Sequence, residues 1–334
     1  MVVLINFLKY KPFKARVDLK QGLLFIALVL FAIVLLAGGG YSNSAKRGLA
    51  LFATSVLPCL FPYAFISASL SMLGITSKIS LKATPFTKKV FNTGGVSAYA
   101  LFISLIAGYP MGAKTVADLR EKNLLSPTES ERASTFCSTS SPAFLLSTVG
   151  AVCFNSALFG MLLLLSHLLS CLLVGIIFSF YKRKEKPSNS TIPPLKIDNV
   201  FYESVFSAIN SALFVGGVIT LFSVLIDVLF ALNLLYLPTK LFTNLLGDSL
   251  ASKSLMAGIV ECTVGISMLS KKGITPLSLP ICAFTCGFGG MCIIVQSIAF
   301  LKRAKIKTTP FLIAKMLHGG FSFIFCLFFN LFLL

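Results

Sequence analysis

The sequence predicts an all-α polytopic membrane protein with two inverted-topology repeats, each containing a re-entrant helical hairpin and a broken transmembrane helix. Hydrophobic residues make up 56% of the chain and charged residues only 12%, whereas soluble domains are about 25% charged. Long apolar runs recur, and their continuous rather than alternating pattern favours helices over a barrel. Features of the first half also return about 150 residues later, which indicates an internal duplication.

The first half is expected to alternate apolar segments with charged ones, and the apolar segments include one hairpin turn and one break. These are a first span at 21–38, a kinked helix at 42–74, a basic loop at 75–94, a hairpin at 95–119, a charged stretch in water at 120–132, a broken span at 133–154 and an unbroken span at 156–181. Pro58 and Pro62 predict the kink. The hairpin turns at Gly108-Tyr109-Pro110, and its two short halves need cover from protein or a cavity within a membrane.

A proline-rich polar linker at 182–198 divides the chain, and the second half repeats the order of the first. Its segments are a long helix at 200–232, a second hairpin at 249–270, a broken span at 276–301 and a final span at 309–334. The features that recur about 150 residues apart are Gly108 with Glu261, Cys137 with Cys286, and His167 with His318. We therefore expect an N-terminal segment with the first helix at 1–41, a first repeat at 42–181, a linker at 182–199 and a second repeat at 200–334.

The net charge of +18 is concentrated between the apolar runs. This is the distribution of cytoplasmic loops, so it favours membrane anchoring over a nucleic-acid patch. A count of crossings with the N-terminus in the cytoplasm places all basic clusters on that side and orients the two halves oppositely. The clusters are Lys9 to Lys20, Lys78 to Lys89, Lys182 to Lys186 and Lys302 to Lys307. The N-terminal segment resembles an anchor more than a cleaved signal, although cleavage after residue 36 stays open.

Broken helices in inverted repeats are typical of secondary transporters, whose binding sites lie near the midplane. Half-helix ends expose N–H groups that attract anions, and hydroxyls add donors and acceptors without fixed charge. The alternative is that these hydroxyls bond only to their own helix. The substrate-binding candidates are Gly108, Tyr109, Pro110, Gly112, Lys114, Ser138, Thr139, Ser140, Ser141, Pro142, Glu261, Thr263, Gly265, Cys286 and Gly287.

Glu261 and His318 are the candidates for proton or ion coupling. Glu261 lies in the apolar run GIVECTVGI, and a carboxylate at the membrane centre costs about 2.5–3.5 kcal/mol, which favours a functional role. Its alternative role is a cap on a neighbouring half-helix. His318 with His167 would form a proton relay or would simply bond a neighbouring helix. Lys114 would attract an anion or extend toward the membrane surface.

No enzyme, metal or cofactor signature is present. The sequence contains no HExxH, GxSxG or P-loop pattern, so we expect no catalysis. The nine cysteines form no CxxC pair, and two histidines lie far from any acidic cluster. Buried apolar cysteines without a metal are therefore expected.

The strings GYPMGAKTVADL, STFCSTSSPAFLLSTVGAVCF, LLSHLL and GIVECTVGI resemble sporulation integral membrane proteins of the nucleoside-recognition, or Gate-domain, superfamily. That superfamily is similar to the concentrative nucleoside transporters. The resemblance covers residues 42–334 and implies transport of dipicolinate, a small aromatic dianion, in a spore-forming bacterium. It also implies binding roles for the residues that match its motifs, which are Gly108, Tyr109, Pro110, Gly112, Lys114, Ser138, Thr139, Ser140, Pro142, Glu261, Thr263 and Gly265. Ser141 departs from the glycine that the family pattern has before Pro142.

The sequence thus predicts a secondary transporter of a small polar or anionic solute in a bacterial cell membrane, with the outer forespore membrane as the expected location. A non-transporting scaffold for spore maturation and a nucleoside transporter are the alternatives, and a membrane enzyme is a distant third. The expected partners are the solute and the lipid bilayer, without nucleic acid. A coupling proton or sodium ion and a homo-oligomeric assembly are further hypotheses.

Overall fold

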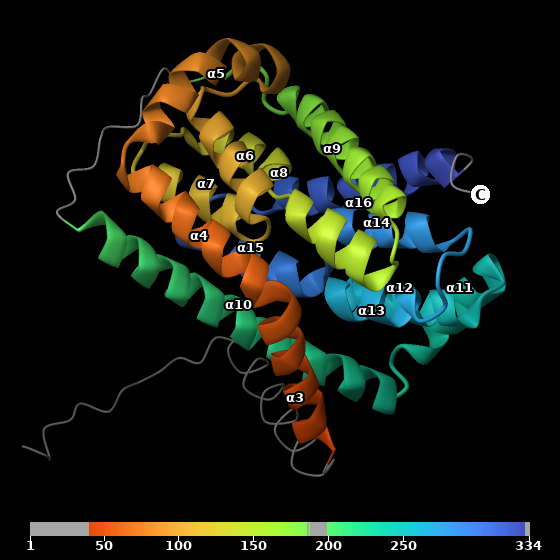
Figure 1. The fold of residues 1–334 in the computed structure, drawn as a ribbon. Helices are drawn as coiled ribbons and strands as arrows, with labels where there is room; N and C mark the ends of the chain where they lie inside the picture. Colours follow the sequence, from red (N-terminus) through yellow and green to blue (C-terminus); the bar gives the residue numbers. More distant parts are fainter. Residues whose placement is uncertain (1–39, 186, 188–198, 331–334) are drawn as a thin grey trace, which may run out of the picture. The chain divides into compact units, whose positions relative to one another are not determined.

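A computed structural model describes residues 40–185, 187 and 199–330. The chain groups into two compact units, residues 1–43 and 44–334, and the second unit contains both repeats (Figure 1). The expected first span at 21–38 and most of the linker at 182–198 lie outside the described residues.

The first repeat consists of helices separated by short turns. Its elements are α3 (Tyr41–Leu51), the π-helical segment η2 (Phe52–Val56), α4 (Leu57–Met72), α5 (Ile75–Phe91), α6 (Val96–Ala107), α7 (Met111–Glu121), α8 (Pro127–Phe136), the π-helical segment η3 (Phe144–Cys153) and α9 (Ala157–Ser179). The second repeat consists of α10 (Val200–Ala231), α11 (Tyr236–Leu246), α12 (Ser249–Val260), α13 (Cys262–Ser270), α14 (Ser278–Phe288), α15 (Gly290–Arg303) and α16 (Thr309–Phe329).

The two repeats have the same order of elements, and the predicted fold class is confirmed. The hairpin α6/α7 corresponds to α12/α13, and the broken helix α8/η3 corresponds to α14/α15. Equivalent helices also contact each other, since α4 packs on α10 and α9 packs on α16.

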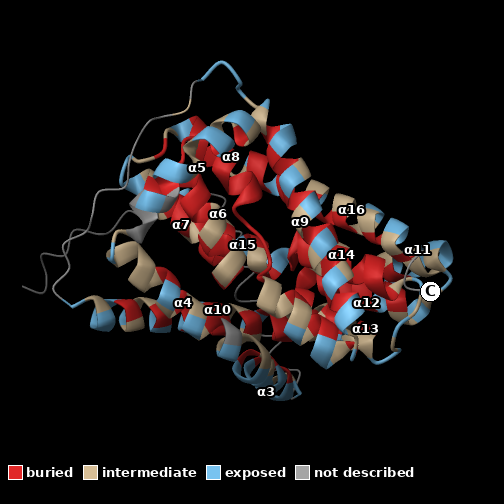
Figure 2. Ribbon diagram, turned by 45° about the horizontal axis from the view of Figure 1, so that its top comes forward, coloured by how far each residue is buried: buried red, intermediate tan, exposed pale blue. Residues whose placement is uncertain are grey.

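Among the described residues, four helices are long and apolar enough to cross a membrane, or up to six if each bent pair is one span. Figure 2 shows exposed positions along α9, α10 and α16. Large apolar residues occupy many of these positions, including Leu165, Leu213 and Met316. Water would oppose such faces and lipid accepts them. The protein is therefore an integral membrane protein.

Two buried clusters join the repeats to each other. The first contains residues of α6, α7, α8, α10 and α15, and the second contains residues of η3, α9, α12, α13 and α14. Each broken helix therefore contributes one half to each cluster. The breaks at residues 137–143 and at Gly289 are the places where the chain passes from one cluster to the other.

The prediction that residues 120–132 lie in water is wrong for their last part. Ser126 caps α8 in a reciprocal pair of bonds with Glu129, and Glu129 and Glu131 are buried. The Glu129 carboxylate also accepts the Gly94 N–H at 2.9 Å. Lys182 donates to Glu131 at 2.8 Å, and this bond raises the pKa of the lysine. Protein groups thus replace water around these charges.

Arg132 is as enclosed as Glu129, with 1% of its surface exposed. Its guanidinium donates to the carbonyl oxygens of Asn92 at 2.7 Å, Tyr181 at 2.8 Å and Lys182 at 2.6 Å. Those carbonyls follow the C-terminal ends of α5 and α9, where the helix dipole favours a cation. Arg132 therefore joins α8 to both helix ends.

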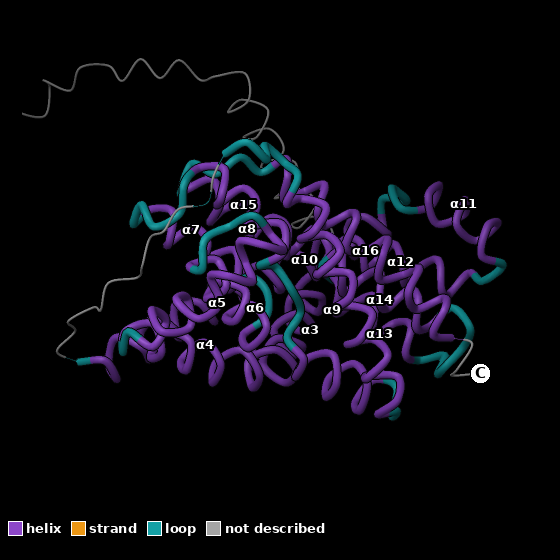
Figure 3. Tube along the Cα trace, turned by 90° about the horizontal axis from the view of Figure 1, so that it is seen from above, coloured by secondary structure: helices purple, strands orange, loops and turns teal. Residues whose placement is uncertain are grey.

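Two short helices also depart from the sequence prediction. The expected basic loop at 75–94 is mostly helix α5, and α11 forms where the sequence predicted no element; both belong to the helical trace in Figure 3. Each segment is amphipathic and shorter than a membrane span. The basic residues of the first segment indicated a loop, although that segment also carries an apolar face. They occupy equivalent places before the two hairpins.

We predict that Arg132→Met lowers the midpoint of thermal unfolding in detergent by several degrees. The change leaves three buried carbonyl groups without their donor, and each such group costs about 1–3 kcal/mol. Arg183→Met is the matched control, because Arg183 is exposed, and its midpoint should match the parent protein. Equal midpoints for the two variants would contradict the anchoring role.

Candidate functional site

The tip of the first hairpin packs against the break in α8/η3. A Cβ atom built on Gly112 would lie 1.9 Å from the Cys137 carbonyl oxygen and 2.6 Å from the Ser104 hydroxyl. Gly108 has φ +72°, a conformation that favours glycine, and its added Cβ would lie 3.0 Å from the Ser141 nitrogen. Only a residue without a side chain allows this close approach, so the GYPMG sequence fixes the hairpin on the break.

The second hairpin repeats this arrangement with different residues. A Cβ atom on Gly265 would lie 2.4 Å from the Gly258 Cα, so α12 and α13 meet backbone to backbone. A Cβ atom on Gly290, at the start of α15, would lie 3.0 Å from the Cys262 nitrogen. Each hairpin tip therefore contacts the break of its own repeat.

Two backbone N–H groups of the first break already donate hydrogen bonds to side chains. The Thr139 N–H donates to the Ser104 hydroxyl, and the Ser140 N–H donates to His167 Nε2, both at 2.9 Å. The expectation that the break offers bare N–H groups to an anion is wrong for these two positions. A low-dielectric interior penalises unpaired N–H groups, so the fold supplies partners for them.

Glu261 lies between α12 and α13 and caps the second of these helices. Its Oε2 atom accepts the Val264 N–H at 2.8 Å and the Thr263 hydroxyl at 2.5 Å. The capping alternative is therefore present in the structure. The same residue also lines a cavity between the two repeats, so its capping role does not exclude it from the candidate site.

Tyr109 connects the two repeats through hydrogen bonds. Its hydroxyl donates to the Cys286 carbonyl oxygen at 3.0 Å, at the C-terminal end of α14. Lys315 of α16 donates to the Tyr109 hydroxyl at 2.7 Å and to the Ser138 carbonyl oxygen at 3.3 Å. The Ser140 hydroxyl is 3.5 Å from the same Cys286 oxygen. Both breaks and the first hairpin thus meet around one tyrosine.

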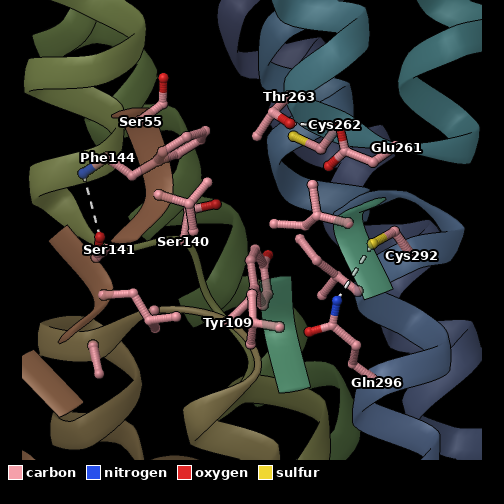
Figure 4. A pocket seen from close by; sticks show the side chains of 17 residues that line it. Ser55, Tyr109, Ser140, Ser141, Phe144, Glu261, Cys262, Thr263, Cys292 and Gln296 are labelled. Atoms are coloured by element: carbon pink, nitrogen blue, oxygen red, sulfur yellow. Dashed lines mark hydrogen bonds between the residues drawn. The ribbon is translucent and has the colours of Figure 1, made fainter. Parts of the chain in front are cut away.

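A cavity of about 90 Å³, the central cavity, lies where the two breaks and the first hairpin meet. Figure 4 shows Ser140, Ser141 and Phe144 on one wall, Glu261 and Thr263 on the facing wall, and Tyr109 between the walls. The lining residues are Ser55, Val56, Leu60, Ala107, Gly108, Tyr109, Ser140, Ser141, Phe144, Val215, Ile219, Glu261, Cys262, Thr263, Cys292, Ile293 and Gln296. The cavity therefore combines hydroxyls, one carboxylate and apolar side chains from both repeats.

The structure separates the predicted residues into three groups. Gly108, Tyr109, Ser140, Ser141, Glu261 and Thr263 line the cavity. Behind its walls, Gly112, Gly265, Ser138, Thr139, Cys286 and Gly287 take part in packing or hydrogen bonds. Pro110 and Pro142 border the hairpin turn and the first break.

Lys114 belongs to a different cavity of about 550 Å³ between α4, α6 and α7. Its ammonium lies 3.7 Å from the Asp118 carboxylate. Lys114 is thus not part of the arrangement around Tyr109, and its role as an attractor of anions stays a prediction.

Sequence reasoning missed several cavity residues. Ser55, Phe144, Cys292 and Gln296 line the cavity, and Lys315 contacts Tyr109 behind it. Gln296 and Lys315 are single polar residues within apolar runs, and that isolation is the signal that could have identified them. Ser55 and Phe144 carry no comparable sequence signal.

The two predicted relay histidines are neighbours. Their ring centroids are 4.4 Å apart. However, the bonds of the rings run to the backbone, because His318 Nε2 lies 3.1 Å from the His167 carbonyl oxygen and His167 Nε2 accepts the Ser140 N–H. Through these hydrogen bonds, the two histidines connect α9 to α16 and to the first break. A proton-coupling role for His318 stays a prediction.

Comparison with known proteins identifies the family. No family model matches the chain. The sporulation integral membrane protein YlbJ of Bacillus subtilis is 30% identical over 319 residues, which cover 85% of this chain and 76% of the relative. The chain belongs to the YlbJ family. The resemblance to sporulation integral membrane proteins is therefore confirmed.

The fold of this YlbJ-family protein is similar to that of CNTnw. One CNTnw structure is in an inward-facing substrate-bound state. It has a TM-score of 0.57 and 18% sequence identity, and the match covers 93% of this chain and 85% of the CNTnw chain. A variant in an outward-facing state has a TM-score of 0.55 and 15% identity, with coverage of 94% and 85%. These likenesses establish a shared fold and confirm the expected similarity to concentrative nucleoside transporters.

We predict opposite effects of two Gly→Ala changes on this YlbJ-family chain. Gly265→Ala forces α12 and α13 apart at the hairpin tip and should lower the midpoint of thermal unfolding in detergent. Gly217→Ala, in α10 with nothing within 4 Å of the added Cβ, should leave the midpoint unchanged or raise it, since alanine favours helix by about 1 kcal/mol. A midpoint for Gly265→Ala at or above that of Gly217→Ala would contradict the close packing.

Proposed function

We propose that this protein is a secondary transporter that moves a small polar or anionic solute by alternating access. The observation that carries the proposal is the central cavity, whose wall combines both hairpin tips, the first break and α15. Sites of inverted-repeat transporters lie where the broken helices of the two repeats meet near the midplane. The hydroxyls and the carboxylate in this wall suit a polar solute.

The size of the cavity supports a mechanism with moving parts. A volume of about 90 Å³ holds a few water molecules, whereas ligand pockets measure about 300–1,000 Å³. A hairpin or a half-helix therefore has to shift before a solute can enter. CNTnw, which shares this fold, is known in an inward-facing substrate-bound state and in an outward-facing state.

Dipicolinate is the first candidate solute. The chain belongs to a family named for sporulation, and the sequence motifs resemble those of spore-former transporters. Two half-helices, η3 and α13, begin at the cavity wall with Phe144 and Cys262, and each helix N-terminus is equivalent to roughly half a positive charge. A nucleoside is the competing solute, because the fold is shared with CNTnw.

Glu261 is the residue that we propose for proton coupling. It combines a position at the cavity wall with a burial of 99%, since only 1% of its surface is exposed. A carboxylate in such a position changes the charge of the site when it takes up a proton. Entry of an anion would be easier with this group protonated, which links the solute to a proton. A coupling sodium ion is the alternative.

We propose that the basic clusters face the cytoplasm and that the protein lies in a bacterial membrane, with the outer forespore membrane as the expected one. Three clusters meet around the turn between α7 and α8. Arg132 bonds the carbonyls of Asn92 and Lys182, and Arg303 bonds Asp118 and Glu121. This common location of the clusters fits the positive-inside rule.

We predict that Glu261→Gln lowers uptake of dipicolinate at least tenfold and removes its acceleration by a pH gradient. The amide retains the shape of the carboxylate but cannot carry a proton. Ser140→Ala should raise KM severalfold, because it removes a hydroxyl from the cavity wall. The measurement is uptake of dipicolinate or uridine into proteoliposomes under a pH gradient, a sodium gradient or neither.

Glu203→Gln is the control for this experiment, because Glu203 is exposed in the first turn of α10, and its uptake should match that of the parent protein. Normal uptake by Glu261→Gln and Ser140→Ala would remove the site assignment. A correctly inserted parent protein that moves neither solute would refute transport and favour the scaffold role. Uptake of uridine alone would identify a nucleoside transporter.

A further inference from the structure

Lys315 is a buried cation that the proposed transport mechanism does not yet use. It lies in the membrane-spanning helix α16 with 1% of its surface exposed. Its ammonium donates to the Tyr109 hydroxyl at 2.7 Å and to the Ser138 carbonyl oxygen at 3.3 Å. It also lies 4.1 Å from the centroid of the Tyr109 ring. Every one of these contacts belongs to the first hairpin or to the first break.

The charge of Lys315 has no carboxylate partner among the residues that the structure describes, whose ion pairs involve other lysines and arginines. Buried cations without a partner are costly in a membrane and are rare outside functional sites. Carbonyl dipoles and an aromatic face stabilise the ammonium here, but they do not cancel its charge. Its positive potential therefore extends beyond the groups that hold it.

This potential reaches the central cavity, because Tyr109 both holds the ammonium and lines the cavity. Glu261 is the carboxylate on the facing wall in Figure 4. The cavity thus has a positive group behind Tyr109, between its two walls, and an acid on the wall that faces Ser140 (Figure 4). An anion would be attracted toward Tyr109 and Ser140 and away from Glu261.

We propose that Lys315 is the positioning residue that makes this site selective for anions over neutral solutes of the same shape. It acts across Tyr109, which both contacts the ammonium and lines the cavity. The inference rests on the proposed transport function, because it names the charge class that the same cavity accepts. Two unit charges several ångströms apart in a protein interior interact strongly enough to change affinity by about tenfold to a hundredfold.

The test compares solutes that differ in charge and share a ring. The probes are dipicolinate, pyridine-2-carboxylate and the neutral dimethyl ester of dipicolinate, measured by calorimetric binding to the full chain in detergent. In the parent protein, affinity should follow the order dianion, monoanion, diester. Lys315→Met, which keeps similar volume without charge, should weaken dipicolinate binding by tenfold or more and leave diester binding within twofold.

Three further variants separate selectivity from structural support. Lys315→Arg keeps the charge and should retain the preference for the dianion. Lys240→Gln removes an exposed lysine from α11, and Ser322→Ala removes a buried hydroxyl from α16; both should bind all three probes as the parent does. A purely structural lysine would instead weaken dianion and diester binding alike in Lys315→Met.

The outcomes distinguish this inference from the proposed function. A parent protein that binds none of the probes and transports no solute refutes the function. A parent protein that binds the diester as tightly as the dianion overturns the role of Lys315, even if no Lys315 variant folds. An unchanged dianion preference in Lys315→Met overturns it as well.

Discussion

Close contact between each hairpin tip and the break of its own repeat is the constraint on which the rest of the structure depends. Gly112 lies against the Cys137 carbonyl, and Gly290 lies against the Cys262 nitrogen, with little space for a side chain at either place. A membrane interior offers no water to the ends of interrupted helices, so their polar groups must meet protein. The glycines allow that approach, and they thereby determine where the cavity forms.

Two N–H groups at the first break are satisfied by side chains from other elements. Ser104 and His167 accept hydrogen bonds from these N–H groups, and Glu261 caps α13 within the second hairpin. In a soluble protein, water could take these places. A solute that enters the cavity must therefore compete with internal bonds, and its own acceptors must replace those that it displaces. For the transport that we propose, this competition favours polar solutes over apolar ones.

Charge is paired differently near the ends of α7, α8 and α9 and around the cavity. Near these helix ends, Arg132, Lys182 and Arg303 meet carboxylates or helix C-terminal carbonyls, so these charges hold helices together. Around the cavity, Glu261 and Lys315 are buried and are connected to the cavity directly or through Tyr109. The cost of a central charge in lipid is large, which is why we assign it to the solute rather than to stability.

The sequence by itself determined the fold class, the duplication and the two hairpins, because long apolar runs and the Gly108-Tyr109-Pro110 turn act locally and the same order of features returns in the second half. It also identified Tyr109, Ser140 and Glu261, since polar residues within apolar runs are conspicuous. Only the tertiary structure decided that Lys315 contacts Tyr109 and that Lys114 belongs to another cavity. It also decided that Arg132 is buried. These outcomes depend on contacts between segments distant in the chain, and local pattern does not specify which of two lysines meets a given tyrosine.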